Sequence, residues 1–221
     1  MTFRFRDRFD AGQQLARALE RYRGHPDLLV LALPRGGVPI GFEVAKALGA
    51  PLDIMIVRKL GVPGQEELAL GAIASGGIRI LSDEVISALR IPDWVIATVA
   101  ATEETELERR ERAYREDRPA APVRNHTVIL VDDGLATGAT MRAAAAAIKA
   151  QQPRRLVVAV PVAPAETSAG LRGEVDEVVC LLSPEPFYAV GVWYQDFVQI
   201  RDNEVRELLR LANAPLEAGT G

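Results

Sequence analysis

Runs of aliphatic residues alternate along the chain with segments whose apolar residues recur at helical spacing. The run at 27–34 is continuously apolar and ends at a proline and two glycines, which is typical of a strand buried in a parallel sheet. The predicted strands span 27–34, 51–60, 128–131, 155–163 and 174–183, and the helices of this alternation span 38–49 and 140–152. This order predicts the α/β class, with an open, mostly parallel sheet covered by helices on both faces.

The segment between the second and third of these strands breaks the alternation. Small and apolar residues alternate over 69–81 around Gly76 and Gly77, which predicts a β-hairpin. A long, highly charged helix is expected over 91–117. Its arginine cluster at 109–112 is interpreted as a solvated face with many ion pairs rather than as a basic patch. We therefore expect a single domain, residues 1–221, with a helical insertion at about 82–118.

Length, charge and cysteine content narrow the classes of function. The 221 residues suit one domain, or one domain with an insertion. The net charge of −4 gives no basis for electrostatic binding to nucleic acid or membranes, so neither is expected as a partner. The single cysteine excludes a disulfide framework and a multi-cysteine zinc site. The N-terminal segment has no apolar signal region and no run approaches ~18 apolar residues, so a cytoplasmic protein is expected.

Two adjacent carboxylates, Asp132 and Asp133, end the strand in "VILVDDGLATGATMRAA" (128–144). Ligands of open parallel sheets bind at the carboxyl ends of the strands. The following loop has small side chains and leads into a helix, where exposed amide N–H groups form a cradle for phosphate. The predicted phosphate-binding residues are Ala136, Thr137, Gly138, Ala139 and Thr140.

Carboxylates repel phosphate, so Asp132 and Asp133 should hold something else, either sugar hydroxyls or Mg²⁺. A phosphate beside a diol describes a ribose 5-phosphate. The alternative is that the two carboxylates only cap the next helix. Capping requires a single short polar residue beside the first turn, not a pair four residues upstream.

A second turn of this kind occurs in "LALPRGGVPIGFEVA" (31–45). Arg35, Gly36 and Gly37 offer a guanidinium and bare backbone amides, which suit a diphosphate. The glycines are expected to adopt unusual φ angles, but they follow too late to orient the Arg35 amide. A cis peptide bond before Arg35 would orient it. The alternative is a tight turn that leaves Arg35 in solvent.

The stretch "VILVDDGLATGAT" resembles the phosphoribosyl-diphosphate (PRPP) binding motif of the type I phosphoribosyltransferases, and "PRGG" resembles their pyrophosphate loop. The resemblance extends over roughly residues 25 to 200, with Gly134 as a departure, because the family more often has an aliphatic residue there. It implies Mg²⁺-dependent transfer of the 5-phosphoribosyl group from PRPP to a nitrogenous base or another acceptor. It also implies a cis peptide bond at Pro34–Arg35, because family members often have one at this place.

The resemblance also assigns roles in the reaction. Asp132 and Asp133 would hold the ribose hydroxyls, and both are candidate ligands of the Mg²⁺ that PRPP brings. Arg35 and Lys59 would neutralise the departing diphosphate, with Lys59 on a loop at 57–74 that closes over the sugar. Sugar cleavage through an oxocarbenium-like transition state needs positioning and charge neutralisation and no histidine base.

A C-terminal hood over the base is implied by the aromatic stretch at 183–202. Phe187 or Tyr188 would stack on the base, and Asp196 lies one place away from the family's acidic position. The stretch "LLSPEP" lacks the lysine that purine enzymes place there, so the acceptor is left open. A homodimer is also left open.

Two other readings of the sequence have different functional consequences. One is a non-catalytic PRPP- or nucleotide-binding regulator of the same fold. The other is a phosphatase in which Asp132 and Asp133 hold a metal. The phosphatase is disfavoured because the chain lacks a nucleophile at the Asp-x-Asp spacing.

Overall fold

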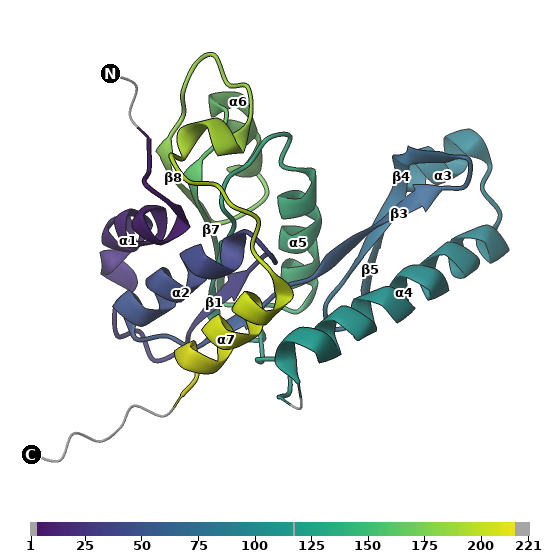
Figure 1. Cartoon of the computed structure of the whole chain (residues 1–221). Helices are drawn as coiled ribbons and strands as arrows, with labels where there is room; N and C mark the ends of the chain where they lie inside the picture. Colours follow the sequence, from purple (N-terminus) through teal and green to yellow (C-terminus); the bar gives the residue numbers. More distant parts are fainter. Residues whose placement is uncertain (1–3, 117, 215–221) are drawn as a thin grey trace, which may run out of the picture.

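The computed structural model describes residues 4–116 and 118–214. It contains a five-stranded parallel sheet and a separate three-stranded antiparallel sheet (Figure 1). The parallel sheet has the order β2-β1-β6-β7-β8. Its strands are β1 (Leu28–Ala32), β2 (Leu52–Ile54), β6 (Thr127–Val131), β7 (Arg155–Val162) and β8 (Glu177–Leu182). The expected α/β class and parallel sheet are confirmed.

Helices cover both faces of this sheet, and so its central strands are apolar throughout. Alternate β1 residues belong to different cores: Val30 packs with the α1 and α2 side, whereas Leu31 packs with the α5 side. One face carries α1 (Arg8–Ala18), α2 (Gly37–Leu48) and α7 (Asp202–Ala212), and the other carries α5 (Ala139–Ala150) and α6 (Ala165–Leu171). Two 3₁₀ turns, η1 (Glu20–Tyr22) and η2 (Val190–Trp193), complete this part.

The predicted strand at 51–60 is wrong as a single element. It is divided between β2 and β3 (Val57–Val62), which belong to different sheets. Met55 still donates its N–H to the Ala32 carbonyl, whereas the Ile56 carbonyl accepts from Ser75 of the hairpin. The apolar residues continue across this change of partner strand, so the hydrophobic pattern alone does not show where β2 ends and β3 begins.

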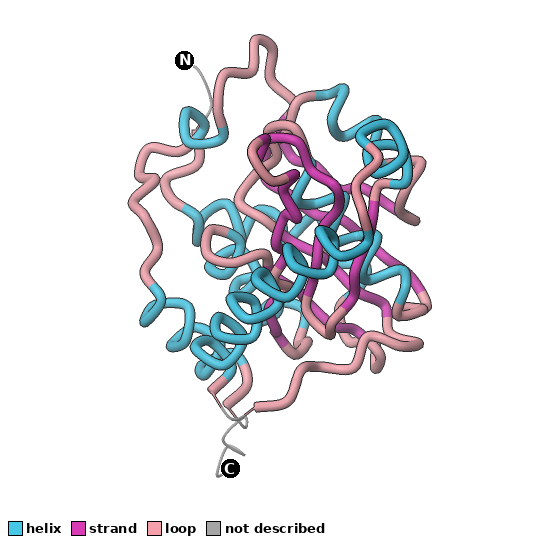
Figure 2. Tube along the Cα trace, turned by 90° about the vertical axis from the view of Figure 1, so that its right-hand side faces the viewer, coloured by secondary structure: helices cyan, strands magenta, loops and turns pink. Residues whose placement is uncertain are grey.

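Residues 57–115 form an arm that projects from the parallel sheet (Figure 1). It contains the predicted hairpin, formed by β4 (Gln65–Ala74) and β5 (Ile78–Leu81) with positive φ at Gly76 and Gly77, and β3 pairs with β4 to complete a three-stranded sheet. The helices α3 (Asp83–Leu89) and α4 (Asp93–Arg115) follow, and α4 lies along the hairpin strands (Figures 1 and 2). No described helix, including the 23-residue α4, is both long and apolar enough to cross a bilayer.

Three helices, α1, α6 and α7, were not predicted from the sequence. α1 begins where the Asp7 carboxylate accepts from the Asp10 amide at 2.8 Å, a capping contact that satisfies an unpaired helix donor. α7 is a strongly amphipathic helix that buries Val205 and Leu209. Its apolar positions recur at helical spacing, so the sequence carries a signal for this helix.

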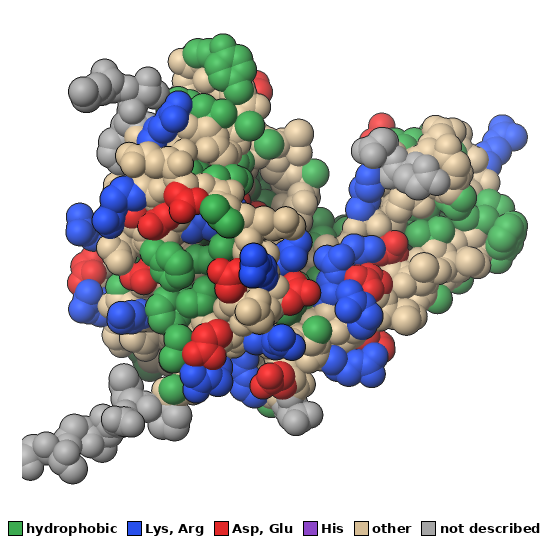
Figure 3. All heavy atoms as spheres, in the orientation of Figure 1, with side chains coloured by type: hydrophobic (Ala, Val, Ile, Leu, Met, Phe, Trp, Pro, Cys, Tyr) green, Lys and Arg blue, Asp and Glu red, His purple; other side chains and the backbone are tan. Residues whose placement is uncertain are grey.

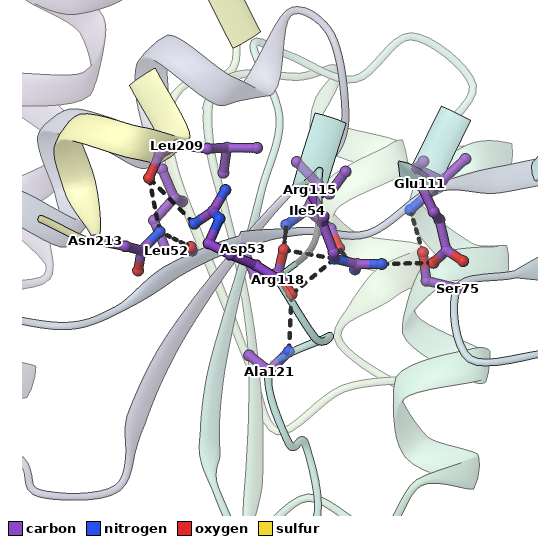
Figure 4. A network of polar contacts seen from close by, with 11 residues as sticks. Leu52, Asp53, Ile54, Ser75, Glu111, Arg115, Arg118, Ala121, Leu209 and Asn213 are labelled. Atoms are coloured by element: carbon purple, nitrogen blue, oxygen red, sulfur yellow. Dashed lines mark hydrogen bonds and ion pairs between the residues drawn. The ribbon is translucent and has the colours of Figure 1, made fainter. Parts of the chain in front are cut away.

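A buried ion pair fastens the end of α4 to β2 (Figure 4). Arg115 Nε donates to Asp53 Oδ1 at 2.9 Å, and its Nη2 donates to the Ile54 carbonyl at 2.7 Å. Asp53 also accepts from the Ala121 amide at 2.9 Å, and Glu111 accepts from Arg115 Nη1 at 2.7 Å. Because both charged groups are almost fully buried and fully paired, the orientation of α4 relative to the sheet is strongly constrained.

The substitution Asp53→Ala should lower the free energy of unfolding by about 3–5 kcal/mol, because it removes the buried carboxylate that pairs with Arg115 and leaves Glu111 as its remaining carboxylate partner. Denaturant-induced unfolding followed by circular dichroism measures this. The matched control is Asp27→Ala, which removes an exposed carboxylate paired with Arg154 and should cost about 0–1 kcal/mol. A loss for Asp53→Ala no larger than that of the control would contradict the anchoring role.

Candidate functional site

The strand order reverses between β1 and β6. β1 connects through α2 to β2 on one side, and β6 connects through α5 to β7 on the other, with α2 and α5 on opposite faces of the sheet. Open α/β sheets bind ligands in the crevice at such a switch point. Ala32 pairs with Val131 in register, so the loops that follow these two strands meet at one edge.

The two loops approach each other so closely that only glycine fits. A Cβ on Gly36 would lie 2.1 Å from Asp133 Oδ2, and one on Gly37 would lie 2.9 Å from the Val131 carbonyl oxygen. The predicted unusual φ angles are wrong: Gly36 has φ −61°, and Gly37 is not among the glycines with positive φ. The Pro34–Arg35 peptide bond is cis, as expected. The glycines are therefore needed for close approach to the carboxylates.

Asp132 and Asp133 are half-buried at this edge, and Asp132 Oδ1 accepts from the Asp133 amide at 2.8 Å. Burial and then the neighbouring Asp133 charge raise the pKa of Asp132 well above its ordinary value. Burial also raises the pKa of Asp133, although the Arg8 guanidinium opposes this shift. Two carboxylates held in this way favour a ligand that donates hydrogen bonds or carries positive charge.

Sequence reasoning missed Arg8 as a member of this site. Its Nε donates to Asp133 Oδ2 at 2.8 Å, and its Nη1 donates to the Val198 carbonyl at 2.8 Å. The guanidinium also lies 3.8 Å from the centre of the Phe197 ring. No local pattern could reveal a contact between residues 125 positions apart.

The C-terminal segment 183–201, called the hood here, packs on the same edge. The Tyr194 hydroxyl donates to the Asp133 carbonyl at 2.5 Å, and Tyr194 is buried. A Cβ on Gly134 would lie 2.6 Å from Val190 Cγ1, so an aliphatic residue there would displace the hood. This contact gives a steric reason for glycine at position 134.

Of the three predicted base-binding residues, Tyr188, at 79%, and Asp196 are exposed. Phe187 is half-buried and packs against the core on the α1 and α2 side. Asp196 accepts from the Val198 amide at 3.1 Å, which turns its carboxylate toward its own loop. The structure thus gathers the three residues in the hood without bringing them to one point.

The predicted phosphate loop has the required open backbone. Gly138 has φ 76° and caps α5, and the loop's other members, Ala136, Thr137, Ala139 and Thr140, are exposed. Thr167 holds the loop in place, since its hydroxyl donates to the Ala136 carbonyl at 2.9 Å. The Ala139 amide, the first of α5, donates to the Thr137 hydroxyl at 3.4 Å. The start of this helix is the kind of backbone that binds anions.

Lys59 lies on β3 beside this phosphate loop. It lines a cavity of about 290 Å³ together with Ala139 and Thr140. Arg35 lines a different cavity, so the two predicted diphosphate-binding cations do not share one pocket. The structure therefore associates Lys59 with the start of α5.

Arg35 lines a cavity of about 390 Å³ between its own loop and the arm. Its Nη1 is 3.6 Å from Asp202 Oδ1, and Tyr114 donates to the same oxygen at 2.7 Å. Arg109 and Arg110 line this cavity too, although the sequence suggested only a solvated face for them. Figure 3 shows Lys and Arg side chains gathered where the arm meets the rest of the molecule.

Comparisons with known proteins agree with this geometry. The model of the phosphoribosyl transferase domain family matches residues 6–192. Two Mycobacterium tuberculosis proteins, each named "putative phosphoribosyl transferase", are 45% identical over 216 residues, which is 97% of this chain and 48% of theirs. The chain thus spans about half the length of these curated relatives. The crystal structure of TT1426 from Thermus thermophilus has a TM-score of 0.83 and 45% identity, covering 94% of this chain and 98% of that one.

The substitution Gly36→Ala should push the Asp133 carboxylate away from Arg8 and lower the free energy of unfolding by about 1–3 kcal/mol. The matched glycine control is Gly173→Ala, where the added Cβ has its nearest neighbour at 4.0 Å and the change should stay within about 0.5 kcal/mol. Denaturant unfolding of both variants measures the difference. Equal free energies of unfolding for the two variants would show that the loops accommodate a side chain at position 36 without loss of stability.

The raised pKa of Asp132 makes its ionisation unfavourable to the folded state. The cost is present above the folded-state pKa and absent below the ordinary value of about 4. Asp132→Asn should therefore be more stable than the parent near pH 7, and the gain should vanish toward about pH 4. Urea unfolding at both pH values, without divalent cations, tests this. A variant less stable than the parent at neutral pH would contradict it.

Proposed function

The chain belongs to the phosphoribosyl transferase domain family, and we propose that it transfers the 5-phosphoribosyl group of PRPP to a nitrogen acceptor, releasing diphosphate, with Mg²⁺ as cofactor. The observation that carries the proposal is the pairing of two loops at the switch point. Asp133 lies against Gly36 and Asp132 against Gly37 on one side, and both precede the open backbone of 136–140 on the other. This arrangement matches the two ends of a ribose 5-phosphate.

In the proposed complex the 5-phosphate accepts hydrogen bonds from the first amides of α5 and from Thr137 and Thr140. Asp132 and Asp133 accept hydrogen bonds from the ribose hydroxyls. Arg8 donates to the Asp133 carboxylate and Tyr194 donates to the Asp133 carbonyl, so both hold Asp133 in position. The sugar is thereby positioned before its bond to diphosphate breaks.

The residues present also suit a divalent cation bound with PRPP. Two adjacent half-buried carboxylates have raised pKa values, and a nearby cation would offset the cost of ionising both. Asp132 and Asp133 would hold Mg²⁺ together with oxygens of PRPP. When bound, Mg²⁺ supplies positive charge that stabilises the diphosphate as it leaves.

The hood supports an acceptor with a flat ring. Tyr188 is exposed on it, and Phe187 lies next to Tyr188 in the chain. The hood rests on Gly134 and Tyr194, which tie it to the sugar site. A base stacked on the hood would lie close to the sugar carbon that it attacks.

A non-catalytic PRPP- or nucleotide-binding regulator is the second candidate. The ion pair between Arg8 and Asp133 favours it, because it occupies one carboxylate oxygen that a transferase would present to its substrate. In a regulator the same edge would bind PRPP without release of diphosphate. Release of diphosphate therefore separates the two candidates.

The decisive experiment incubates the protein with PRPP, Mg²⁺ and a panel of purine and pyrimidine bases, and measures diphosphate release. Asp132→Asn combined with Asp133→Asn should reduce release by about 100-fold or more, because both ribose contacts lose their charge. The control is Asp83→Asn with Asp93→Asn, two exposed carboxylates of the arm, which should keep full activity. PRPP binding without release for any base would favour the regulator, and near-normal turnover in the first variant would refute the ribose assignment.

A further inference from the structure

Three arginines from separate parts of the chain line the cavity of about 390 Å³. Arg35 comes from the loop after β1, and Arg109 and Arg110 come from α4 of the arm. Tyr114 and Asp202 complete the polar lining. Nothing in the family comparison or in the sequence motifs assigns a function to the two arginines of α4.

The anchor at the end of α4 explains how these arginines reach the loop. Arg115 is fixed to Asp53 in β2, and Arg110 and Arg109 lie about one and a half helical turns earlier. Tyr114, one residue before the anchor, donates to Asp202 at the start of α7. Helix α4 is therefore held at its base in the orientation that points both arginines into the cavity.

The contacts of these arginines leave donors available for an anion. Glu106 accepts from Arg110 Nε at 2.7 Å and from Arg109 Nε at 2.7 Å and Nη2 at 3.0 Å. In the described structure the two terminal amino groups of Arg110 have no hydrogen bond to Glu106. Arg35 has its ion-pair partner Asp202 at 3.6 Å, beyond hydrogen-bond distance.

The charges around the cavity favour an anion. Arg35, Arg109 and Arg110 carry three positive charges against the two negative charges of Glu106 and Asp202. The two arginines lower the pKa of Glu106 to about 2, so Glu106 remains ionised and keeps both guanidinium groups in place. Guanidinium groups bind phosphate oxygens through pairs of parallel hydrogen bonds, which an anion with several oxygens can exploit.

We propose that this cavity binds the diphosphate of PRPP, and that Arg109 and Arg110 of the arm act with Arg35 on the leaving group. The inference rests on the proposed function. The cavity begins at Pro34 and Arg35, and the next residue, Gly36, touches Asp133. The cavity and the proposed sugar site therefore share the loop that follows β1.

In the reaction the bond between C1 of ribose and the diphosphate oxygen breaks, and both electrons go to the diphosphate. The acceptor nitrogen forms the new bond to C1 and gives up a proton to solvent. Arg109 and Arg110 exchange no proton, because an arginine guanidinium stays protonated in proteins. Their contribution is positive charge and hydrogen-bond donors aimed at the leaving group.

The test measures binding of inorganic diphosphate with Mg²⁺ to the full chain by calorimetry. Arg109→Ala and Arg110→Ala should each weaken binding roughly tenfold, as should Arg35→Ala, because each removes a charge-assisted contact. The matched control is Arg112→Ala, an exposed arginine of α4 that does not line the cavity, and its affinity should stay within about twofold. Circular dichroism confirms that each variant is folded.

Ribose 5-phosphate provides the second probe, because it lacks the diphosphate. Its affinity should be unchanged in Arg109→Ala and Arg110→Ala, since neither residue is assigned to the sugar site. An equal loss for both probes would overturn the inference, as would unchanged diphosphate binding in the variants or no binding to the parent protein. If diphosphate binding follows the expected pattern while no base supports transfer, the cavity assignment stands and the proposed function fails.

Discussion

The close contact between Gly36 and Asp133 is the constraint on which the rest of the site depends. It brings the loop after β1 against the loop after β6, at the point where the strand order reverses. A side chain at position 36 would displace the Asp133 carboxylate from this position. The contact also fixes Asp133 where Arg8 and Tyr194 can reach it, and so it links the N-terminal helix and the hood to the two central strands.

The buried ion pair of Arg115 and Asp53 fixes the position of the arm, as the contact at Gly36 fixes the two loops. A long polar helix such as α4 gains little from burial, because only a few of its residues face the core. Its position therefore depends on polar contacts: Arg115 at its end, and Glu103 and Glu104, which pair with Arg58 and Arg79 of the hairpin. These pairs hold the arm as one unit and bring its arginines to the edge of the sheet. The arm thus extends away from the parallel sheet, while its base contributes residues to the edge that carries the candidate site.

The site contains groups that favour ligand binding but lower the stability of the folded protein. Two adjacent carboxylates with raised pKa values are unfavourable in a folded protein unless a partner offsets them. Arg8 offsets one of them from within the chain, and the proposed sugar and cation would offset the remainder. The arginine cavity has the opposite character, with more positive than negative charge. One edge of the sheet therefore combines an acidic and a basic environment, which suit the hydroxyl-bearing and the anionic parts of the proposed substrate.

The sequence alone determined the features that depend on neighbouring residues. The aliphatic runs predicted the parallel sheet, and the paired carboxylates and small-residue loops indicated the turns proposed to bind phosphate and diphosphate, because strand burial and helix starts follow local patterns. The tertiary structure decided everything that depends on contacts between distant segments. It ended the strand at Ile54, where the chain exchanges β1 for the hairpin as its partner, and it gave the glycines of the diphosphate loop a steric reason in place of a conformational one. It also brought Arg8 to Asp133 and two arginines of α4 to Arg35, because the pairing of charges across more than 70 residues follows from packing geometry and leaves no periodic trace in the chain.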